Sequence, residues 1–191
     1  MGLIIEKKQG VKRSRAFTHA LADIPGGVCI ATDELTQTTI PEGTAVGKDE
    51  NGLYHIVKAA EITTAALADA TIYIVKKGHN FKVGDFVMLK TSGKSYAITA
   101  IATNAVNEDA DDITVATSLG IVAAEGDTLM QAVKAGASGS DFKYTPVGLL
   151  GTGYDVEPNT VATVVTIGQV EGDKIPALGA IADALPLINI I

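Results

Sequence analysis

The sequence predicts a mainly β protein in which a small β-barrel, at about residues 71–135, is inserted in or joined to a second β-rich module with a short C-terminal helix. Aromatic residues make up only 5% of the chain, so its apolar content is mostly Ala, Val, Ile and Leu. Val, Ile and Thr are stiff at χ1 and suit pleated sheets. Glycines occur in short groups that punctuate the strands, and residues 96–101 and 112–117 alternate between apolar and polar side chains.

Turn signals separate several short strands before residue 71. The strands predicted there occupy residues 28–31, 38–46 and 53–58. The Asn51-Gly52 pair favours a type I′ hairpin turn that leads into the last of them. Residues 59–70 stay open between helix and strand, because their alanines favour a helix while Ile62-Thr63-Thr64 favours a strand.

The predicted barrel begins with a strand at 71–75 and contains two Gly-Asp turns, Gly84-Asp85 and Gly126-Asp127. In each turn the glycine adopts backbone angles that a side chain would forbid, and the aspartate bonds to its own backbone. An acidic loop at 104–111 joins the two alternating segments. The barrel pattern brings no visible catalytic residues with it.

After the barrel, residues 136–140 are small and polar and are interpreted as a linker. Strands are predicted at 147–150, 161–167 and 187–191, with a short helix over Pro176–Leu185 that Pro186 ends. The pieces before residue 71 and after residue 135 are each too small for an independent core. We therefore expect residues 16–70 and 141–191 to pack together as one module.

The charge distribution separates a basic N-terminal arm, residues 1–15, from an acidic body. The arm carries a net charge of +4, because Glu6 opposes five basic residues: Lys7, Lys8, Lys12, Arg13 and Arg15. The other 176 residues hold ten Lys and 21 acidic residues, a net charge of −11. A basic arm on an acidic body favours docking onto an acidic surface, which includes another copy of the chain. The alternative is a solvated, frayed terminus. The acidic body argues against a broad nucleic-acid groove, so no nucleic-acid partner is expected.

No catalytic or cofactor motif is present, and neither an enzymatic activity nor a cofactor is expected. The sequence lacks a nucleophile elbow and a phosphate-binding loop, and His19, His55 and His79 lack the close pairing of zinc motifs. An enzyme site assembled from distant residues is the remaining alternative. The single cysteine, Cys29, is expected in the core. The apolar stretch at 175–191 is too short and interrupted to span a bilayer, so no membrane association is expected.

Two features of the barrel permit binding roles. The acidic stretch 107–112 offers carboxylate oxygens to calcium, but it lacks the loop glycine and distal Glu of an EF-hand, so a solvated connection is expected. A basic cluster lies close to Tyr73 and Phe81 in sequence and consists of Lys76, Lys77, His79, Lys82 and Lys90. Such a cluster is compatible with a non-enzymatic barrel that binds glycans or single-stranded nucleic acid. We favour lysines that guard an exposed hairpin edge.

The run Phe81-Lys82-Val83-Gly84-Asp85-Phe86-Val87 resembles one found in head-decoration and head-fiber proteins of tailed bacteriophages. The resemblance covers roughly residues 40–191 and extends to the terminal segment Leu185-Pro186-Leu187-Ile188, where that family has an L-P-x-I pattern. Its further segments are Ser95–Ile101, Asp112–Val115, Leu119-Gly120, Gly126–Leu129, Thr145–Leu150, Thr166–Val170 and Ala184–Ile191. These motifs describe turns and strands and carry no catalytic signature.

The resemblance implies a structural virion protein on the outer capsid surface, made in the host cytoplasm. Such a protein docks on the major capsid protein and stabilises the shell or carries a fiber protein, often as a homotrimer. The module formed by residues 16–70 and 141–191 would then be proximal to the capsid. The residues expected to bind the capsid or another partner are Lys7, Lys8, Lys12, Arg13, Arg15, Leu187, Ile188, Ile190 and Ile191.

Overall fold

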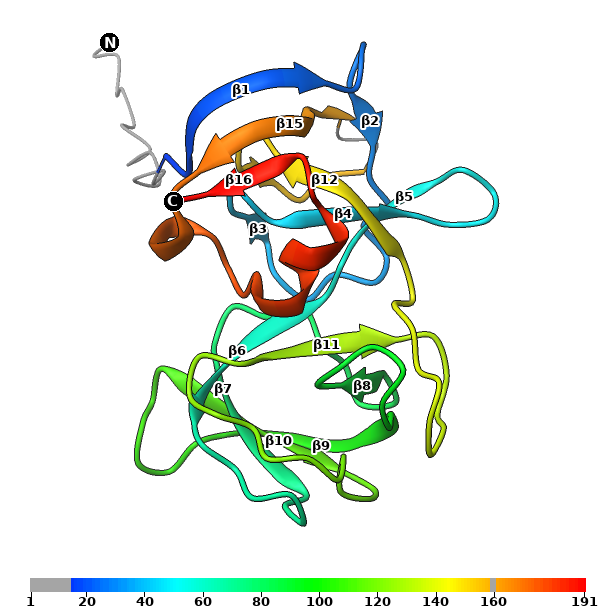
Figure 1. Ribbon diagram of the computed structural model, residues 1–191, viewed down its shortest axis with the longest axis vertical. Coiled ribbons are helices and arrows are strands. Elements are labelled where there is room, and N and C mark those ends of the chain that lie inside the picture. Colours follow the sequence, from blue (N-terminus) through cyan, green and yellow to red (C-terminus); the bar gives the residue numbers. More distant parts are fainter. Residues whose placement is uncertain (1–14, 159–160) are drawn as a thin grey trace, which may run out of the picture.

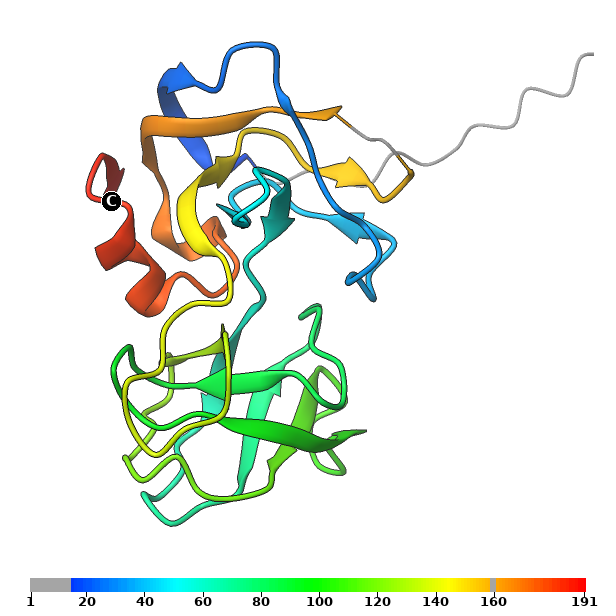
Figure 2. The same cartoon turned by 90° about the vertical axis from the view of Figure 1, so that its right-hand side faces the viewer.

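The computed structural model describes residues 15–158 and 161–191, and it confirms a mainly β fold made of two β-rich modules (Figure 1). The barrel comprises residues 59–132. The sheet module comprises residues 15–58, 133–158 and 161–191. The chain passes between the two modules twice, once on each side of the barrel, so the barrel is an insertion in the sheet module (Figure 2).

The sheet module is built on a six-stranded sheet. Its strands, in spatial order, are β1 (Phe17–Asp23), β15 (Val164–Val170), β12 (Thr145–Leu150), β4 (Ala45–Lys48) and β5 (Tyr54–Ile56), with β16 (Ile188–Ile190) also paired to β15. Two two-stranded sheets complete the module: β3 (Thr39–Ile40) with β13 (Tyr154–Asp155), and β2 (Val28–Cys29) with β14 (Val161–Ala162).

The six-stranded sheet requires a glycine where β12 meets β15. A Cβ atom on Gly148 would lie 2.5 Å from the carbonyl oxygen of Val165 and 2.8 Å from a methyl carbon of Val164. No side chain fits at that separation, so Gly148 lets the two strands approach. Its neighbour Leu149 is fully buried and pairs with Val165, which anchors the register.

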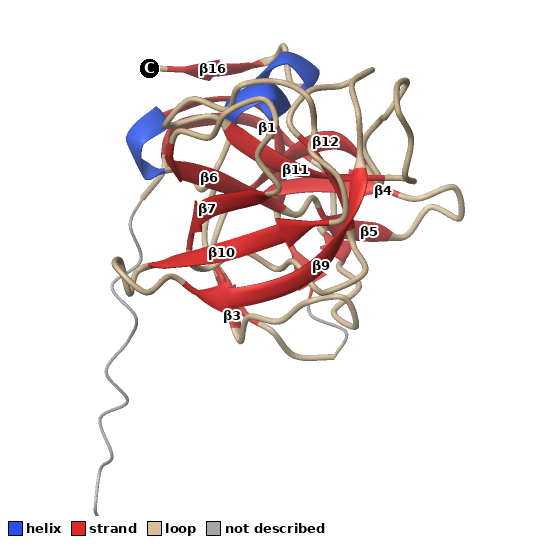
Figure 3. Ribbon diagram, turned by 90° about the horizontal axis from the view of Figure 1, so that it is seen from below, coloured by secondary structure: helices blue, strands red, loops and turns tan. Residues whose placement is uncertain are grey.

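The barrel closes through six antiparallel strands, seen from below in Figure 3. Their order around the barrel is β10 (Ala110–Val115), β7 (Ile72–Lys76), β6 (Ala59–Thr64), β11 (Thr128–Ala132), β8 (Phe86–Met88) and β9 (Tyr96–Thr103). The last pairing, of β9 with β10, aligns Ile113 with Ile101 and completes the ring. Both alternating segments of the sequence therefore lie in the barrel, side by side.

The predicted barrel boundary at residue 71 is wrong, because β6 belongs to the barrel. Ala60 and Ile62 of β6 point into the barrel core and are almost fully buried. β6 pairs with β11 on one side and with β7 on the other. Without it the barrel would have two open edges, so the closure of the ring decides the open choice at 59–70 in favour of a strand.

The predicted linker at residues 136–140 is also wrong, since this segment folds back onto the barrel. The Ser95 N–H donates to the carbonyl of Gly136 at 2.9 Å, and the Ser92 N–H donates to the carbonyl of Ser140 at 2.6 Å. Ser140 is buried, and its hydroxyl donates to the carbonyl of Gly93 at 3.0 Å. Small polar residues here make a tight loop-to-loop contact and not a flexible spacer.

Two further expectations are corrected in detail. The predicted helix over Pro176–Leu185 is a short 3₁₀ helix, η2 (Gly179–Ala184), preceded by a single 3₁₀ turn, η1 (Gly172–Lys174). Cys29 is exposed, because strand alternation turns Val28 and Ile30 inward and the residue between them outward. The final strand is confirmed as β16, which runs parallel to β15.

The modules share one hydrophobic core besides having their own. Tyr73, Ile98 and Leu129 fill the centre of the barrel. Met88 and Met130, on the barrel strands β8 and β11, instead pack in the same cluster as sheet-module residues that include Leu149, Val165 and Ile181. The contact between the modules is therefore a continuous apolar core, which holds the barrel against the sheet.

Candidate functional site

The sheet module brings its two terminal segments together at one corner. Val170, at the end of β15, pairs with Phe17 of β1 on one side and with Ile190 of β16 on the other. Because neighbouring strands lie about 4.8 Å apart, the Cα atoms of Phe17 and Ile190 are roughly 10 Å apart. Figure 1 shows the start of β1 beside the C-terminal end. We call Arg15, Phe17, Leu187, Ile190 and Ile191 the terminal corner.

Three apolar residues of the terminal corner are exposed: Leu187 is 61% exposed, Ile190 39% and Ile191 60%. Phe17 is half-buried and packs against the core shared by the two modules. Ile188 is 6% exposed and belongs to that core. Its predicted role in partner binding is corrected to a role in the core, because its side chain lies in the same buried cluster as Ile181 and Leu185.

Glu42 fixes the point at which the chain enters the terminal corner. Its Oε1 atom accepts hydrogen bonds from the backbone N–H groups of Ala16 and Phe17, each at 3.0 Å. The Glu171 N–H also donates to the carbonyl of Ala16, at 2.9 Å. Arg15 is exposed immediately before this anchor, while the predicted arm residues Lys7, Lys8, Lys12 and Arg13 lie outside the described residues. No local sequence pattern indicates this contact, because Glu42 and Ala16 are 26 positions apart.

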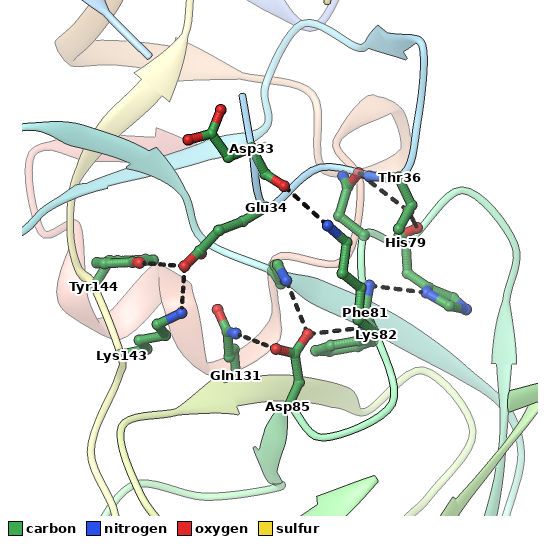
Figure 4. Close-up of polar contacts among 12 residues, drawn as sticks. Asp33, Glu34, Thr36, His79, Phe81, Lys82, Asp85, Gln131, Lys143 and Tyr144 are labelled. Atoms are coloured by element: carbon green, nitrogen blue, oxygen red, sulfur yellow. Dashed lines mark hydrogen bonds and ion pairs between the residues drawn. The ribbon is translucent and has the colours of Figure 1, made fainter. Parts of the chain in front are cut away.

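A second set of polar contacts joins the modules between two loops, residues 32–37 of the sheet module and 79–82 of the barrel (Figure 4). We call these contacts the loop clamp. The Asn80 Oδ1 atom accepts from the N–H groups of Thr36 and Gln37, at 3.0 and 3.1 Å. The carbonyl of His79 accepts from the Gln37 side chain at 3.2 Å, and Lys82 Nζ donates to the carbonyl of Asp33 at 3.0 Å.

A buried ion pair lies beside the loop clamp. Lys58, on the connection between β5 and β6, is 2% exposed, and its Nζ atom lies 2.8 Å from Asp85 Oδ2. The other oxygen of Asp85 accepts from Gln131 Nε2 at 3.0 Å, and Oδ2 also accepts from the Lys82 N–H at 2.9 Å. Both carboxylate oxygens of Asp85 thereby accept hydrogen bonds. The predicted Gly84-Asp85 turn thus supplies the anion that holds the modules together.

Glu34 forms a second charged group at the same junction. Its Oε1 atom accepts from Lys143 Nζ at 2.7 Å and from the Tyr144 hydroxyl at 3.0 Å. Burial disfavours the carboxylate, but the bonds from Lys143 and Tyr144 and the charges of Lys143 and Lys58 outweigh it, so the pKa of Glu34 is lowered. Burial works against the Lys143 cation too, yet its bond to Glu34 prevails and raises the pKa of Lys143. The pair is charged at neutral pH.

A cleft of about 790 Å³ opens between the modules beside these contacts. Its walls come from β6, the end of β7, and the segment from η1 to η2. The charged side chains that line it are of both signs and comprise Glu61, Lys76, Lys77, Asp173 and Lys174. Lys76 lies 3.8 Å from Glu61, Lys77 lies 3.9 Å from Asp111, and Lys174 pairs with Glu171. The basic residues of the cleft are therefore balanced by carboxylates.

The predicted basic cluster of the barrel is dispersed, and its aromatic neighbours are covered. Lys82 reaches the loop clamp, whereas Lys76 and Lys77 have acidic partners across the barrel wall. Tyr73 and Phe81 are 0% and 2% exposed and belong to the barrel core. These two rings offer no stacking surface to a base or a sugar.

The acidic loop that follows β9 is held by its own side chains. Asn104 Oδ1 accepts from the N–H groups of Val106 and Asn107, and Asn107 Oδ1 accepts from the Asp109 N–H. Within residues 15–158 and 161–191, no group of three or more His, Cys, Asp or Glu side chains is placed to hold a metal ion. In the same ranges, no helix has both the length and the apolar character needed to cross a membrane.

Comparison with known proteins gave no match. No family model fits the sequence, and neither a curated protein nor a solved structure matches the chain.

Proposed function

We propose that this chain is a structural virion protein of a tailed bacteriophage, a capsid decoration or head-fiber base protein that docks on the major capsid protein. It sits on the outer capsid surface, stabilises the shell or carries a fiber protein, and assembles as a homo-oligomer, with a trimer as the expected form. The sequence resemblance described above supplies this class of function. No catalytic residues, cofactor, membrane or nucleic acid enter the mechanism.

The observation that carries the proposal is the geometry of the terminal corner. The end of the basic arm, Arg15, precedes β1, and the exposed apolar residues Leu187 and Ile191 flank β16; both strands pair with the end of β15, one on each side. The corner lies at the side of the sheet module (Figure 1), and its residue Ile190 also lines the cleft beside the barrel. The terminal corner therefore combines positive charge with apolar surface, a combination suited to an acidic protein surface that has apolar hollows.

Positive charge and the burial of apolar side chains contribute separately to the proposed docking. The arm residues Lys7, Lys8, Lys12 and Arg13 together with Arg15 attract an acidic partner over distances of about a Debye length, roughly 8 Å at physiological salt. Burial of a Leu or Ile side chain at the corner then contributes about 1.5–3 kcal/mol each. Several subunits held in one oligomer multiply this modest affinity, because they engage repeated sites on the shell together.

Electron microscopy of the protein with capsid shells of the encoding phage tests this proposal. We expect density on the outside of the shell at regular lattice positions, with the sheet module inward and the barrel outward. Deletion of residues 1–14 weakens attachment and reduces its dependence on salt. Bare shells at saturating protein, together with a strict monomer by light scattering, would reject the proposal.

A further inference from the structure

His79 occupies a position in the loop clamp where its protonation state matters. The Phe81 N–H donates to His79 Nδ1 at 3.2 Å, so Nδ1 carries no proton and the neutral ring has its proton on Nε2. Nε2 lies 3.3 Å from Asp111 Oδ2, on the barrel strand β10. The His79 side chain is 6% exposed. In its neutral form the ring thus bridges its own loop and the barrel wall.

A second proton on the ring would change both contacts in opposite directions. Nδ1 would become a donor and would face the Phe81 N–H, another donor, across 3.2 Å. The contact of Nε2 with Asp111 would become an ion pair. The charged ring is therefore repelled from Phe81 and drawn toward β10, and the loop 79–82 cannot keep its present form.

That same loop holds the sheet module. The carbonyl of His79 and the side chain of Asn80 accept the hydrogen bonds from Thr36 and Gln37 described above. The barrel and the sheet module are thus tied through the two residues that must move when the ring is charged. We propose that His79 is an acid-sensitive latch, whose protonation releases the loop clamp and loosens the barrel from residues 32–37. This inference is independent of the proposed capsid role.

The electrostatic surroundings of His79 give the direction of the effect. Burial of the ring disfavours its charged form, and this outweighs the attraction and hydrogen bond of Asp111, so the pKa of His79 is lowered. Lys77, 3.9 Å from Asp111, also competes for that carboxylate. The other charged residues that line the spaces next to His79 are Lys58, Glu61, Lys76, Asp173 and Lys174. A lowered pKa means that the native clamp is fully stable above the ordinary value of 6.5 and weakens as the pH falls below it.

Amide hydrogen exchange on the whole protein tests the latch. Protection factors of the Thr36, Gln37 and Phe81 amides, corrected for the intrinsic rate at each pH, are compared between pH 7.5 and pH 5. We expect these protection factors to fall severalfold in the wild type. The protection factor of the Val115 amide, which lies on β10 and donates to the carbonyl of Thr71, should change little. The matched control is His79→Asn, whose side-chain oxygen keeps an acceptor near Phe81 without titrating; its protection factors should stay constant.

Equal pH profiles in the wild type and His79→Asn would overturn the proposal, as would constant protection in the wild type. If the Asn variant does not fold, the wild-type ring is titrated by NMR. Its midpoint should coincide with the shifts of the Thr36 and Gln37 amides, and Asp111→Asn should move that common midpoint to lower pH. Ring and amide midpoints that differ would also reject the latch.

Discussion

The barrel and the sheet module differ in their strand edges, which are all paired in the barrel and partly unpaired in the sheet module. Every barrel strand pairs on both sides, so the ring has no free edge. In the sheet module, β1 and β16 pair with β15 alone, and Leu187, Ile190 and Ile191 stay exposed beside β16. An open edge with apolar side chains is a place where another chain can pair or pack. The barrel therefore satisfies all its strand edges internally, whereas the sheet module leaves an apolar edge uncovered, where we propose that a partner docks.

The contrast between the modules requires that the junction hold them in one arrangement. Asp85→Ala is the substitution expected to weaken this junction most. The substitution leaves the Lys58 cation buried without its carboxylate and removes the acceptor of Gln131. Such an uncompensated charge costs about 3–5 kcal/mol of unfolding free energy. Urea unfolding measures this loss. Lys77→Ala, which removes a more exposed pair with Asp111, is the control and should cost less than about 1 kcal/mol. Equal losses in the two variants would contradict the account of the junction.

Two adjacent residues of β11 sharpen the contrast between the private core of the barrel and the shared core. Leu129 is fully buried inside the barrel, while Met130, also fully buried, packs in the shared core with Ile181. Either residue replaced by Ala should cost about 2–5 kcal/mol. Only Met130→Ala should also lower the exchange protection of the Ile181 amide at low denaturant. If Leu129→Ala lowers that protection as much, the two cores are not distinct.

The Glu34 site gives a smaller, pH-dependent test on the sheet-module side of the junction. The pKa of Glu34 is lowered from its ordinary value of 4.5, so its contribution is present above that pH and is lost as the pH falls through the folded-state pKa. The urea midpoint of the wild type should therefore decline below about pH 4.5 more steeply than that of Glu34→Gln. Parallel curves would mean that Lys143 and Tyr144 contribute nothing through this carboxylate. Because the Glu34 side chain is one-third exposed, we expect a modest effect.

Local pattern carried much of the fold. Alternation predicted β9 and β10, and the final strand is present as β16. The Asn51-Gly52 pair does lie in the turn before β5, but the predicted type I′ geometry is wrong, because Gly52 has a positive φ and Asn51 does not. The pattern failed where closure of the ring decided the outcome, as at β6, whose alanines were equally compatible with a helix. It also failed at residues 136–140, where small polar side chains predict a linker, although the backbone of this segment forms hydrogen bonds with residues 92–95.

The candidate site was predictable only in part. The apolar residues near the C-terminus predicted Leu187 and Ile191 as partner-binding residues. The sequence pattern did not indicate that Ile188, which lies between them, is buried. The contacts of Glu42 with Ala16 and of Asn80 with Thr36 join residues 26 and 44 positions apart. No local signal marks such pairs, because they depend on how distant parts of the chain fold against each other. Asp85 is a turn residue whose carboxylate is available to a distant cation, and it was the only sequence feature that indicated the junction.

We propose that the terminal corner is the site of attachment to a capsid, and co-sedimentation with capsid shells of a tailed bacteriophage tests this proposal most directly. The variant Leu187→Ser/Ile191→Ser changes two exposed side chains, so unfolding free energy should shift by no more than about 1 kcal/mol. Its binding should weaken by at least about tenfold, equivalent to ~1.4 kcal/mol. The control Val106→Ser/Val122→Ser changes two barrel residues that are at least as exposed as the corner pair, and it should bind as the wild type does. Wild-type affinity in the corner variant, or a loss confined to the barrel variant, would contradict the account.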